Sequence, residues 1–247
     1  MKNYKNLLAL VALLALPAAG ALAAGGGADL KPSGANINDL GSLQRGAQLF
    51  MNYCMGCHSA EYMRYNRLAE DLELGEDMVM KNLIFTDQKI GDPMTIAMSQ
   101  ENAEQWFGKA PPDLSLIGRS RGADWVYNYM LGFYRDANGG WNNTVLENAS
   151  MPHVFWQLQG IQEPVYKTVE ENGVERQVVD HLELVEPGSL SPEAYDDSMR
   201  DLAAFIDYLG EPAQLKRKKI GVWVMLYMAF FAFLAYLLKV EYWRDVH

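Results

Sequence analysis

Two cysteines and a histidine carry the most specific chemistry in this sequence of 247 residues. Cys54 and Cys57 are its only cysteines, and His58 follows the second one directly. This C-x-x-C-H spacing is the attachment signature of c-type haem, in which two thiols add across the vinyl groups of the porphyrin. The adjacent histidine is then close enough to bind the iron as an axial ligand. The motif predicts one covalently attached haem c with His58 as an iron ligand.

Three other uses of a paired-cysteine motif fit this chain less well. A redox-active dithiol usually accompanies a βαβ pattern, which the sequence does not show. A structural zinc site needs four ligands, and the four histidines supply no second ligand pair at suitable spacing. A disulfide between Cys54 and Cys57 would close too short a loop to add much stability. Covalent haem is therefore the favoured interpretation.

A six-coordinate electron-transfer haem needs a second axial ligand opposite His58. Thioether sulfur is soft and favours ferrous iron, so it raises the reduction potential. Thirteen methionines compete for this role, and apolar packing explains most of them. Met151 is the strongest candidate, because it lies in a loop stiffened by the proline that follows it. The alternatives are His153, Met94 and Met98.

The anionic propionates of a haem are natural partners for arginine. Arg119 and Arg121 closely follow the sequence APPD at residues 110–113, where the two prolines predict an extended loop. From the residues alone, each arginine is equally well explained as a solvated surface side chain.

The first residues have the organisation of an export signal. Two lysines precede an apolar core at residues 7–16, and small residues at 21–23 offer a cleavage site. The short core and the Gly/Ala-rich stretch after it argue against a membrane anchor. We expect a signal peptide at residues 1–23 and a flexible mature terminus at residues 24–38. Export is consistent with haem attachment, which takes place outside the cytoplasm.

A second apolar run, residues 220–238, has no charged side chain. At about 1.5 Å per residue, a helix of this length is close to the roughly 30 Å thickness of a bilayer core. Aromatic residues near both of its ends suit the membrane interfaces. We expect one transmembrane helix here, with a basic linker at residues 213–219 and a cytoplasmic tail at residues 239–247.

The charges around this span conflict with the export signal. The sequence KRKK at residues 216–219 would by itself place the preceding domain in the cytoplasm. The signal peptide and the haem require the opposite, and a large exported domain fixes its topology before the last helix emerges. We therefore expect a single-pass membrane protein with its haem domain on the side away from the cytoplasm, which the family resemblance given below makes the periplasmic side of a bacterial inner membrane. The basic cluster would then meet lipid headgroups or a partner subunit.

Residues 39–212 are enough for one haem domain with insertions. Apolar periodicity and capping residues predict helices at residues 39–53, 99–106, 123–133 and 191–209. Asn172 and Gly173 separate two β-prone runs, which predicts an inserted two-stranded ribbon. The expected fold is mainly α, a cytochrome c-like haem domain with insertions including a small β-hairpin, plus one C-terminal transmembrane helix.

The last soluble helix is expected to pack against the first. Gly46 lies in the middle of the first helix, where glycine costs about 1 kcal/mol against alanine, so close approach of another backbone would explain it. Phe205 and Tyr208 are predicted to lie near Gly46 and Phe50.

The net charge of −10 is carried by the soluble part, since the segment before the span is basic. An acidic surface attracts basic proteins and repels nucleic acid, so no nucleic-acid partner is expected. Ordinary solubility explains the charge equally well.

Four segments carry a resemblance to a known family. They are CMGCHS at residues 54–59, YMRYNRL at 62–68, APPDLSLI at 110–117 and ASMPH at 149–153. With the order of soluble helix, basic linker and carboxy-terminal span, the chain from residue 39 onwards resembles cytochrome c1. This is the haem subunit of the quinol–cytochrome c oxidoreductase, or bc1 complex, here in its proteobacterial form.

The resemblance implies roles for particular residues. It assigns the sixth iron ligand to Met151 and the propionate-binding arginine to Arg121, and it places Pro111 and Pro112 in the haem pocket. Some family members have an extra disulfide near the haem. This chain has no cysteine left for one, so packing must hold its ligand loop.

The resemblance also implies an electron-transfer subunit with no catalytic acid, base or nucleophile of its own. Such a subunit accepts electrons from the Rieske iron–sulfur protein and passes them to a periplasmic c-type cytochrome. Its implied partners are cytochrome b and the Rieske protein, in a dimeric, proton-translocating oxidoreductase, together with membrane lipid. Two alternatives stay open: a stand-alone tethered cytochrome c or haem subunit of another respiratory complex, and a haem-free assembly factor.

Overall fold

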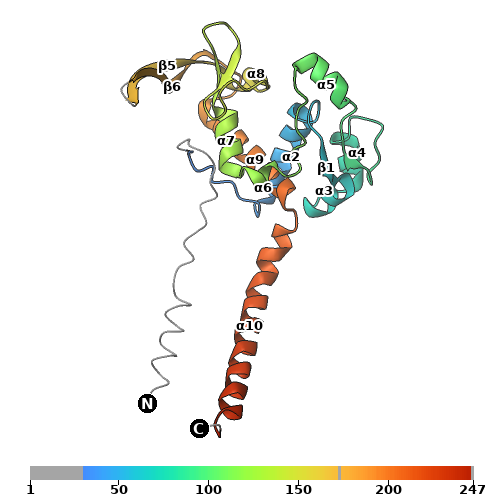
Figure 1. Cartoon of the computed structure of the whole chain (residues 1–247). Coiled ribbons are helices and arrows are strands. Elements are labelled where there is room, and N and C mark those ends of the chain that lie inside the picture. Colours follow the sequence, from blue (N-terminus) through green and yellow to red (C-terminus); the bar gives the residue numbers. More distant parts are fainter. Residues whose placement is uncertain (1–29, 172–173, 246–247) are drawn as a thin grey trace.

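The computed structural model describes residues 30–171 and 174–245, and it consists of a helical domain above one long helix (Figure 1). The helices are α2 (Leu40–Tyr53), α3 (Tyr65–Asp71), α4 (Glu76–Asn82), α5 (Gln100–Phe107), α6 (Ile117–Ser120), α7 (Ala123–Leu131), α8 (Trp156–Gln159), α9 (Pro192–Gly210) and α10 (Gln214–Tyr242). The strands form antiparallel pairs: β1 (Ala60–Arg64) with β2 (Pro93–Met94), β3 (Phe133–Arg135) with β4 (Trp141–Asn143), and β5 (Gly160–Glu171) with β6 (Val174–Pro187). The predicted mainly α fold is confirmed.

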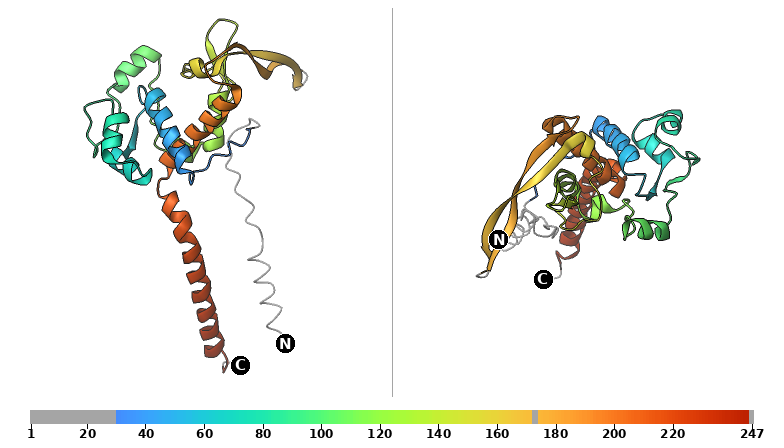
Figure 2. Two further views of the ribbon diagram at one scale, coloured as in Figure 1. Left: turned by 180° about the vertical axis from the view of Figure 1, so that it is seen from behind. Right: turned by 90° about the horizontal axis from the view of Figure 1, so that it is seen from above.

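The core is organised around the contact between α2 and α9, which lie side by side in both views of Figure 2. A Cβ atom on Gly46 would lie 2.2 Å from the carbonyl oxygen of Asp201, so the two backbones touch there. The buried rings of Phe50 and Phe205 are 5.4 Å apart, and Tyr208 lies 5.9 Å from Phe205. The predicted packing of the last soluble helix on the first is confirmed.

Side-chain caps explain where these helices begin. Asp39 accepts a hydrogen bond from the backbone N–H of Ser42 at the start of α2. Ser191 caps α9 in the same way, and Pro192 occupies its first turn. Ser99 caps α5. The helices predicted to begin near residues 39, 99 and 191 are confirmed, and the caps predicted at Ser99 and Ser191 are present.

Two predicted elements have different bounds in the structure. The helix predicted at residues 123–133 ends at Leu131, because Gly132 follows it and Phe133 begins a strand. The hairpin is longer than the β-prone runs, since Gly160 pairs with Pro187 at its base. Its predicted turn at residues 172–173 lies outside the described residues. In Figure 1 the hairpin extends from the domain as a two-stranded ribbon.

Residues 30–38 pack across α7 and α9. The backbone N–H and the hydroxyl of Ser33 both donate to Asp124 Oδ1, at 2.7 and 2.6 Å. The Lys31 ammonium group pairs with Asp196 at 2.9 Å. Long-range polar contacts therefore hold this segment on the domain.

The flexible terminus predicted for residues 24–38 is accordingly wrong for residues 30–38. Their polar composition resembles that of a loose tail, but their partners lie far along the chain on α7 and α9. The predicted signal peptide, residues 1–23, and the residues up to 29 lie outside the described part of the chain.

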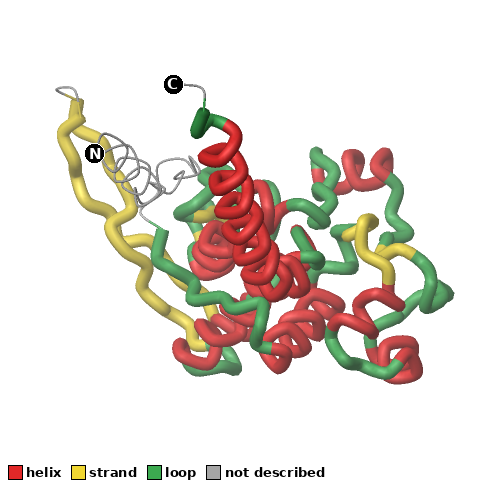
Figure 3. Tube along the Cα trace, turned by 90° about the horizontal axis from the view of Figure 1, so that it is seen from below, coloured by secondary structure: helices red, strands yellow, loops and turns green. Residues whose placement is uncertain are grey.

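Helix α10 contains the predicted membrane span. It is the one helix among the described residues that is long and apolar enough to cross a membrane, with a mean hydropathy of 2.1 and none of its apolar window buried. The basic residues 216–219 belong to this helix, so the predicted linker is its first part. Figure 3 shows α10 nearly end-on beneath the domain. Glu211 joins α10 to the domain, because it pairs with Arg217 of α10 at 2.7 Å and with Arg119 of α6 at 3.6 Å.

Gly46→Ala is expected to destabilise the protein by about 1–3 kcal/mol, because the added methyl group overlaps the α9 backbone. Gly41→Ala in the same helix is the matched control, since its Cβ would meet no backbone atom, only an Arg45 side-chain nitrogen at 3.3 Å and an Asp39 oxygen at 3.5 Å. Thermal unfolding of the full-length chain in detergent measures both. Equal melting temperatures for the two variants would contradict the close backbone contact.

Candidate haem site

Helix α2 ends at the cysteine motif. Cys54 caps the helix, and the backbone N–H groups of Cys57 and His58 both donate to its carbonyl oxygen, at 3.0 and 2.9 Å. No disulfide joins the two cysteines. Burial raises the pKa of Cys54 to about 12, so this thiol is protonated at neutral pH and unlike that of a redox-active dithiol. The turn places both thiols and the imidazole within one short segment.

The proline loop fixes the state of the histidine. His58 Nδ1 lies 2.7 Å from the carbonyl oxygen of Pro112, and a carbonyl only accepts, so Nδ1 carries the proton. Burial lowers the pKa of His58, an effect opposed by this hydrogen bond and by the charge of Asp113. The ring is neutral, and Nε2 is left with a free lone pair. A neutral imidazole with its other nitrogen held by a carbonyl is the form that binds metals.

Further hydrogen bonds tie the proline loop to the residues that follow the motif. Ser115 is 1% exposed, and its N–H donates to Asp113 within the loop. The bonds that join the loop to the following chain are Leu114 N to Ser59 O (2.8 Å), Glu61 N to Asp113 Oδ2 (3.0 Å) and Tyr62 N to Ser115 Oγ (3.1 Å). Pro111 and Pro112 are thereby held beside the haem-attachment motif. The roles of Asp113 and Ser115 were not predicted, because their partners Glu61 and Tyr62 lie more than fifty residues earlier in the chain.

The two candidate arginines differ in their partners. Arg119 lies 3.6 Å from Glu211, so a carboxylate already faces it. Arg121 is exposed, its guanidinium group lies 5.3 Å from the ring of Trp125, and no acidic side chain among the described residues pairs with it. The structure thus leaves Arg121 available to an external carboxylate.

The candidate sixth ligands lie in different surroundings. Met151 is half-buried and packs against the apolar cluster that contains Cys54. Met94 is fully buried in β2, where it pairs with Ala60. Met98 is half-buried in the loop before α5. Of these three, only Met151 lies in the loop between β4 and α8.

His153, the other candidate ligand, lies in an aromatic pocket. It is 2% exposed, stacks on Phe133 at 5.0 Å and meets the edge of Trp141 at 5.2 Å. Burial lowers its pKa to about 4, and Gln159 opposes this shift. Neither ring nitrogen has a hydrogen-bond partner of acceptable geometry among the described residues, Gln159 included. The ring is neutral and is held by aromatic contacts.

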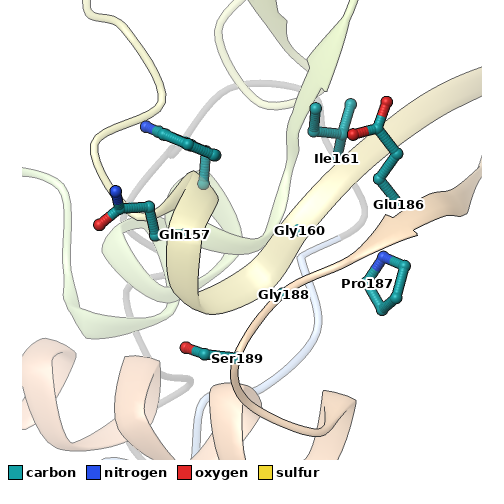
Figure 4. A pocket seen from close by; sticks show the side chains of 8 residues that line it. Gln157, Gly160, Ile161, Glu186, Pro187, Gly188 and Ser189 are labelled. Carbon is teal, nitrogen blue, oxygen red and sulfur yellow. The ribbon is translucent and has the colours of Figure 1, made fainter.

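A hollow at the base of the β5–β6 hairpin contains none of the predicted site residues (Figure 4). Its lining, all within the described residues, is Trp156, Gln157, Gly160, Ile161, Glu186, Pro187, Gly188 and Ser189. It belongs to the inserted ribbon and takes no part in the site.

A covalent c-type haem fits the residues of the site. The two cysteines form no disulfide and have the attachment spacing, a neutral imidazole presents a free Nε2, and Arg121 has no acidic partner among the described residues. This site lies in a helical domain joined to one apolar helix that none of the described residues covers. Fold and site together define a membrane-anchored c-type cytochrome.

Comparisons with known proteins give the family. The model of the Cytochrome C1 family matches residues 35–246. Cytochrome c1 of Allochromatium vinosum is 49% identical over 97% of this chain and 99% of that protein. The ammonia monooxygenase gamma subunit of Nitrosomonas europaea is 44% identical over 95% of this chain and 97% of that protein. Cytochrome c1 of Rhodospirillum rubrum is 26% identical over 94% of this chain and 97% of that protein. The chain belongs to the cytochrome c1 family.

Membership confirms the central functional predictions. Proteins of this family carry a covalently bound c-type haem and serve as the cytochrome c1 subunit of the bc1 complex, together with cytochrome b and the Rieske iron–sulfur protein. The candidate membrane helix α10 fits this anchored subunit.

Asp113→Ala is expected to destabilise the protein by roughly 1–3 kcal/mol, because the N–H groups of Glu61 and Ser115 lose their acceptor. Asp113→Asn keeps one carbonyl oxygen as an acceptor, so its loss of stability should be about half that of Asp113→Ala. Thermal unfolding of the full-length chain measures the difference. Unchanged stability in Asp113→Ala would show that the loop is not held by these bonds.

Proposed function

We propose that Cys54 and Cys57 form the thioether links to the haem and that His58 Nε2 and Met151 Sδ are its axial ligands. The observation that carries this proposal is the bond from His58 Nδ1 to the Pro112 carbonyl, which leaves Nε2 free beside the two thiols. When bound, the haem supplies a one-electron couple between ferrous and ferric iron. The chain fixes the ligands, excludes water and sets the potential.

Met151 is supported by its position. It lies in a loop, is half-buried, and packs against the hydrophobic core of the domain. Met94 is enclosed in a strand pair, and His153 is enclosed by aromatic rings. A thioether favours ferrous iron because sulfur is soft, so this ligand would suit a haem of high potential.

Arg121 is proposed to bind a haem propionate, and Pro111 and Pro112 to line the pocket. Arg121 has no acidic partner among the described residues, whereas Arg119 faces Glu211. The guanidinium group binds carboxylates well because its donors match their two oxygens. Its stack on Trp125 restricts its movement, which favours a defined contact.

The protein is proposed to accept electrons from the Rieske protein and to pass them to a periplasmic c-type cytochrome within a dimeric complex. The net charge of −10 supports a basic acceptor, because opposite charges steer the encounter. Rising salt should then slow the reaction. The work of this subunit is to bring one haem within reach of both partners.

The domain is proposed to lie in the periplasm of a bacterium, anchored to its inner membrane. Residues 1–23 would direct export, and the haem domain at residues 39–212 would follow. Helix α10 would cross the membrane, with residues 239–247 in the cytoplasm. The basic residues 216–219 at its start would bind anionic lipid headgroups.

Purification from solubilised membranes tests the assignment. The chain should co-purify with b-type haems, detected optically, and with a Rieske centre, detected by electron paramagnetic resonance. The relative named as a subunit of ammonia monooxygenase motivates the competing assignment to another complex. Recovery of the chain together with ammonia monooxygenase activity, and without b-type haems or a Rieske centre, would contradict the bc1 assignment.

Met151→Leu is expected to abolish the far-red sulfur-to-iron charge-transfer band and to lower the reduction potential by roughly 100 mV or more, within the ~0.8 V range that axial ligands span. Redox titration with optical spectra measures both. Met98→Leu is the control, since that half-buried methionine lies outside the loop. A retained band in Met151→Leu would transfer the ligand role to another residue.

Arg121→Gln is expected to lower the reduction potential by tens of millivolts, on the scale where about 59 mV is a tenfold change for one electron. Loss of a cation beside the propionates destabilises the electron-rich reduced haem. Arg119→Gln is the matched control and should change the potential less. A larger change of potential in Arg119→Gln than in Arg121→Gln would assign the propionate to Arg119.

A further inference from the structure

Five side chains form a continuous chain of contacts, in which Tyr129 and Phe133 meet edge-to-face and the other two ring pairs are stacked. We call it the ring column: Arg121, Trp125, Tyr129, Phe133 and His153. The first four are spaced four residues apart along α7 and its flanks, so they lie on one side of the helix. The successive separations, measured between ring centres or from the guanidinium carbon, are 5.3, 4.9, 5.0 and 5.0 Å. The column begins at the arginine proposed for the propionate and ends two residues beyond Met151.

The imidazole ring of His153 is the last member of the ring column, and it contacts two aromatic side chains. Its face lies on Phe133 with an interplanar angle of 7°, and the edge contact to Trp141 covers a second side. Both nitrogens are buried without a partner among the described residues. A buried polar atom without a hydrogen bond is unfavourable. The contacts that hold this side chain are therefore those of an aromatic ring.

Strands β3 and β4 hold the other end of the loop that contains Met151. Phe133 in β3 pairs with Asn143 in β4, and Asn143 is 1% exposed. Its amide group donates to the Tyr129 carbonyl at 2.7 Å, and its oxygen accepts from Val145 N at 2.8 Å. The loop that contains Met151 is thus fixed before the methionine by Asn143 and after it by the ring of the histidine.

We infer that His153 is a positioning residue, which holds Met151 in place through the ring column. The inference rests on the proposed axial role of Met151. Both cysteines belong to the haem-attachment motif, so no disulfide of this chain braces the loop. The ring column holds the loop instead. It connects the loop that contains Met151 to Arg121 through packed rings.

Two substitutions in the holoprotein separate ring packing from every role of the nitrogens. His153→Ala removes the ring, and the far-red band should weaken several-fold while the ferrous haem gains the ability to bind carbon monoxide. His153→Phe keeps the stack and should leave the band, the carbon monoxide reaction and the potential as in the parent protein. His181→Ala, an exposed histidine on the hairpin, is the matched control and should change none of them.

Each contrary result has a defined meaning. An intact band and no carbon monoxide binding in His153→Ala would overturn the positioning role. Equal damage in His153→Phe and His153→Ala would assign the effect to the nitrogens and overturn the packing account. If His153→Ala fails to fold, Trp141→Leu removes the edge contact and leaves the stack on Phe133. The inference then predicts a partial loss of the band, and an unchanged band would contradict it.

Met151→Leu separates this inference from the proposed function. A retained band in that variant removes the axial assignment, and the inference with it. Loss of the band in Met151→Leu, combined with an intact band in His153→Ala, removes the inference alone.

Discussion

The hydrogen bond from His58 Nδ1 to the Pro112 carbonyl is the interaction on which the site depends. It joins two segments more than fifty residues apart, and it determines which nitrogen of the ring carries the proton. Without it, the imidazole could rotate or change tautomer, and Nε2 would have no fixed direction. The surrounding backbone bonds serve the same purpose, because they hold the proline loop along the chain that leaves the motif.

The core makes this bond possible by fixing both segments to α9. Gly46 brings α2, and with it the cysteine motif, into contact with the α9 backbone. Gly118 does the same for α6, which follows the proline loop: a Cβ there would lie 2.3 Å from the Ile206 carbonyl oxygen. Gly210 completes this contact near Arg119. Helix α9 is therefore a common base for the motif and for the loop that orients its histidine.

Local signals predicted much of this arrangement. The spacing of Cys54, Cys57 and His58 indicates haem attachment because covalent chemistry fixes that spacing. Capping serines marked the starts of α5 and α9, since a cap acts within one turn, and apolar periodicity indicated α2. The contact at Gly46 followed from the conflict between glycine and a helix interior.

The remaining features depend on partners that are distant in sequence. Residues 30–38 looked like a loose tail because Asp124 and Asp196, which hold them, lie far along the chain. Arg119 and Arg121 are indistinguishable until Glu211 is placed beside the first. The aromatic surroundings of His153 depend on the pairing of β3 with β4, and the first residue of β3, Phe133, was predicted to belong to a helix. A four-residue spacing of aromatic side chains was the available signal for the ring column.

Near-infrared magnetic circular dichroism of the oxidised holoprotein tests the proposed ligation most directly, because the position of its charge-transfer band identifies the pair of axial ligands. The account predicts the signature of histidine–methionine ligation from a single low-spin haem. A signature of two histidine ligands, or of high-spin iron, would contradict it.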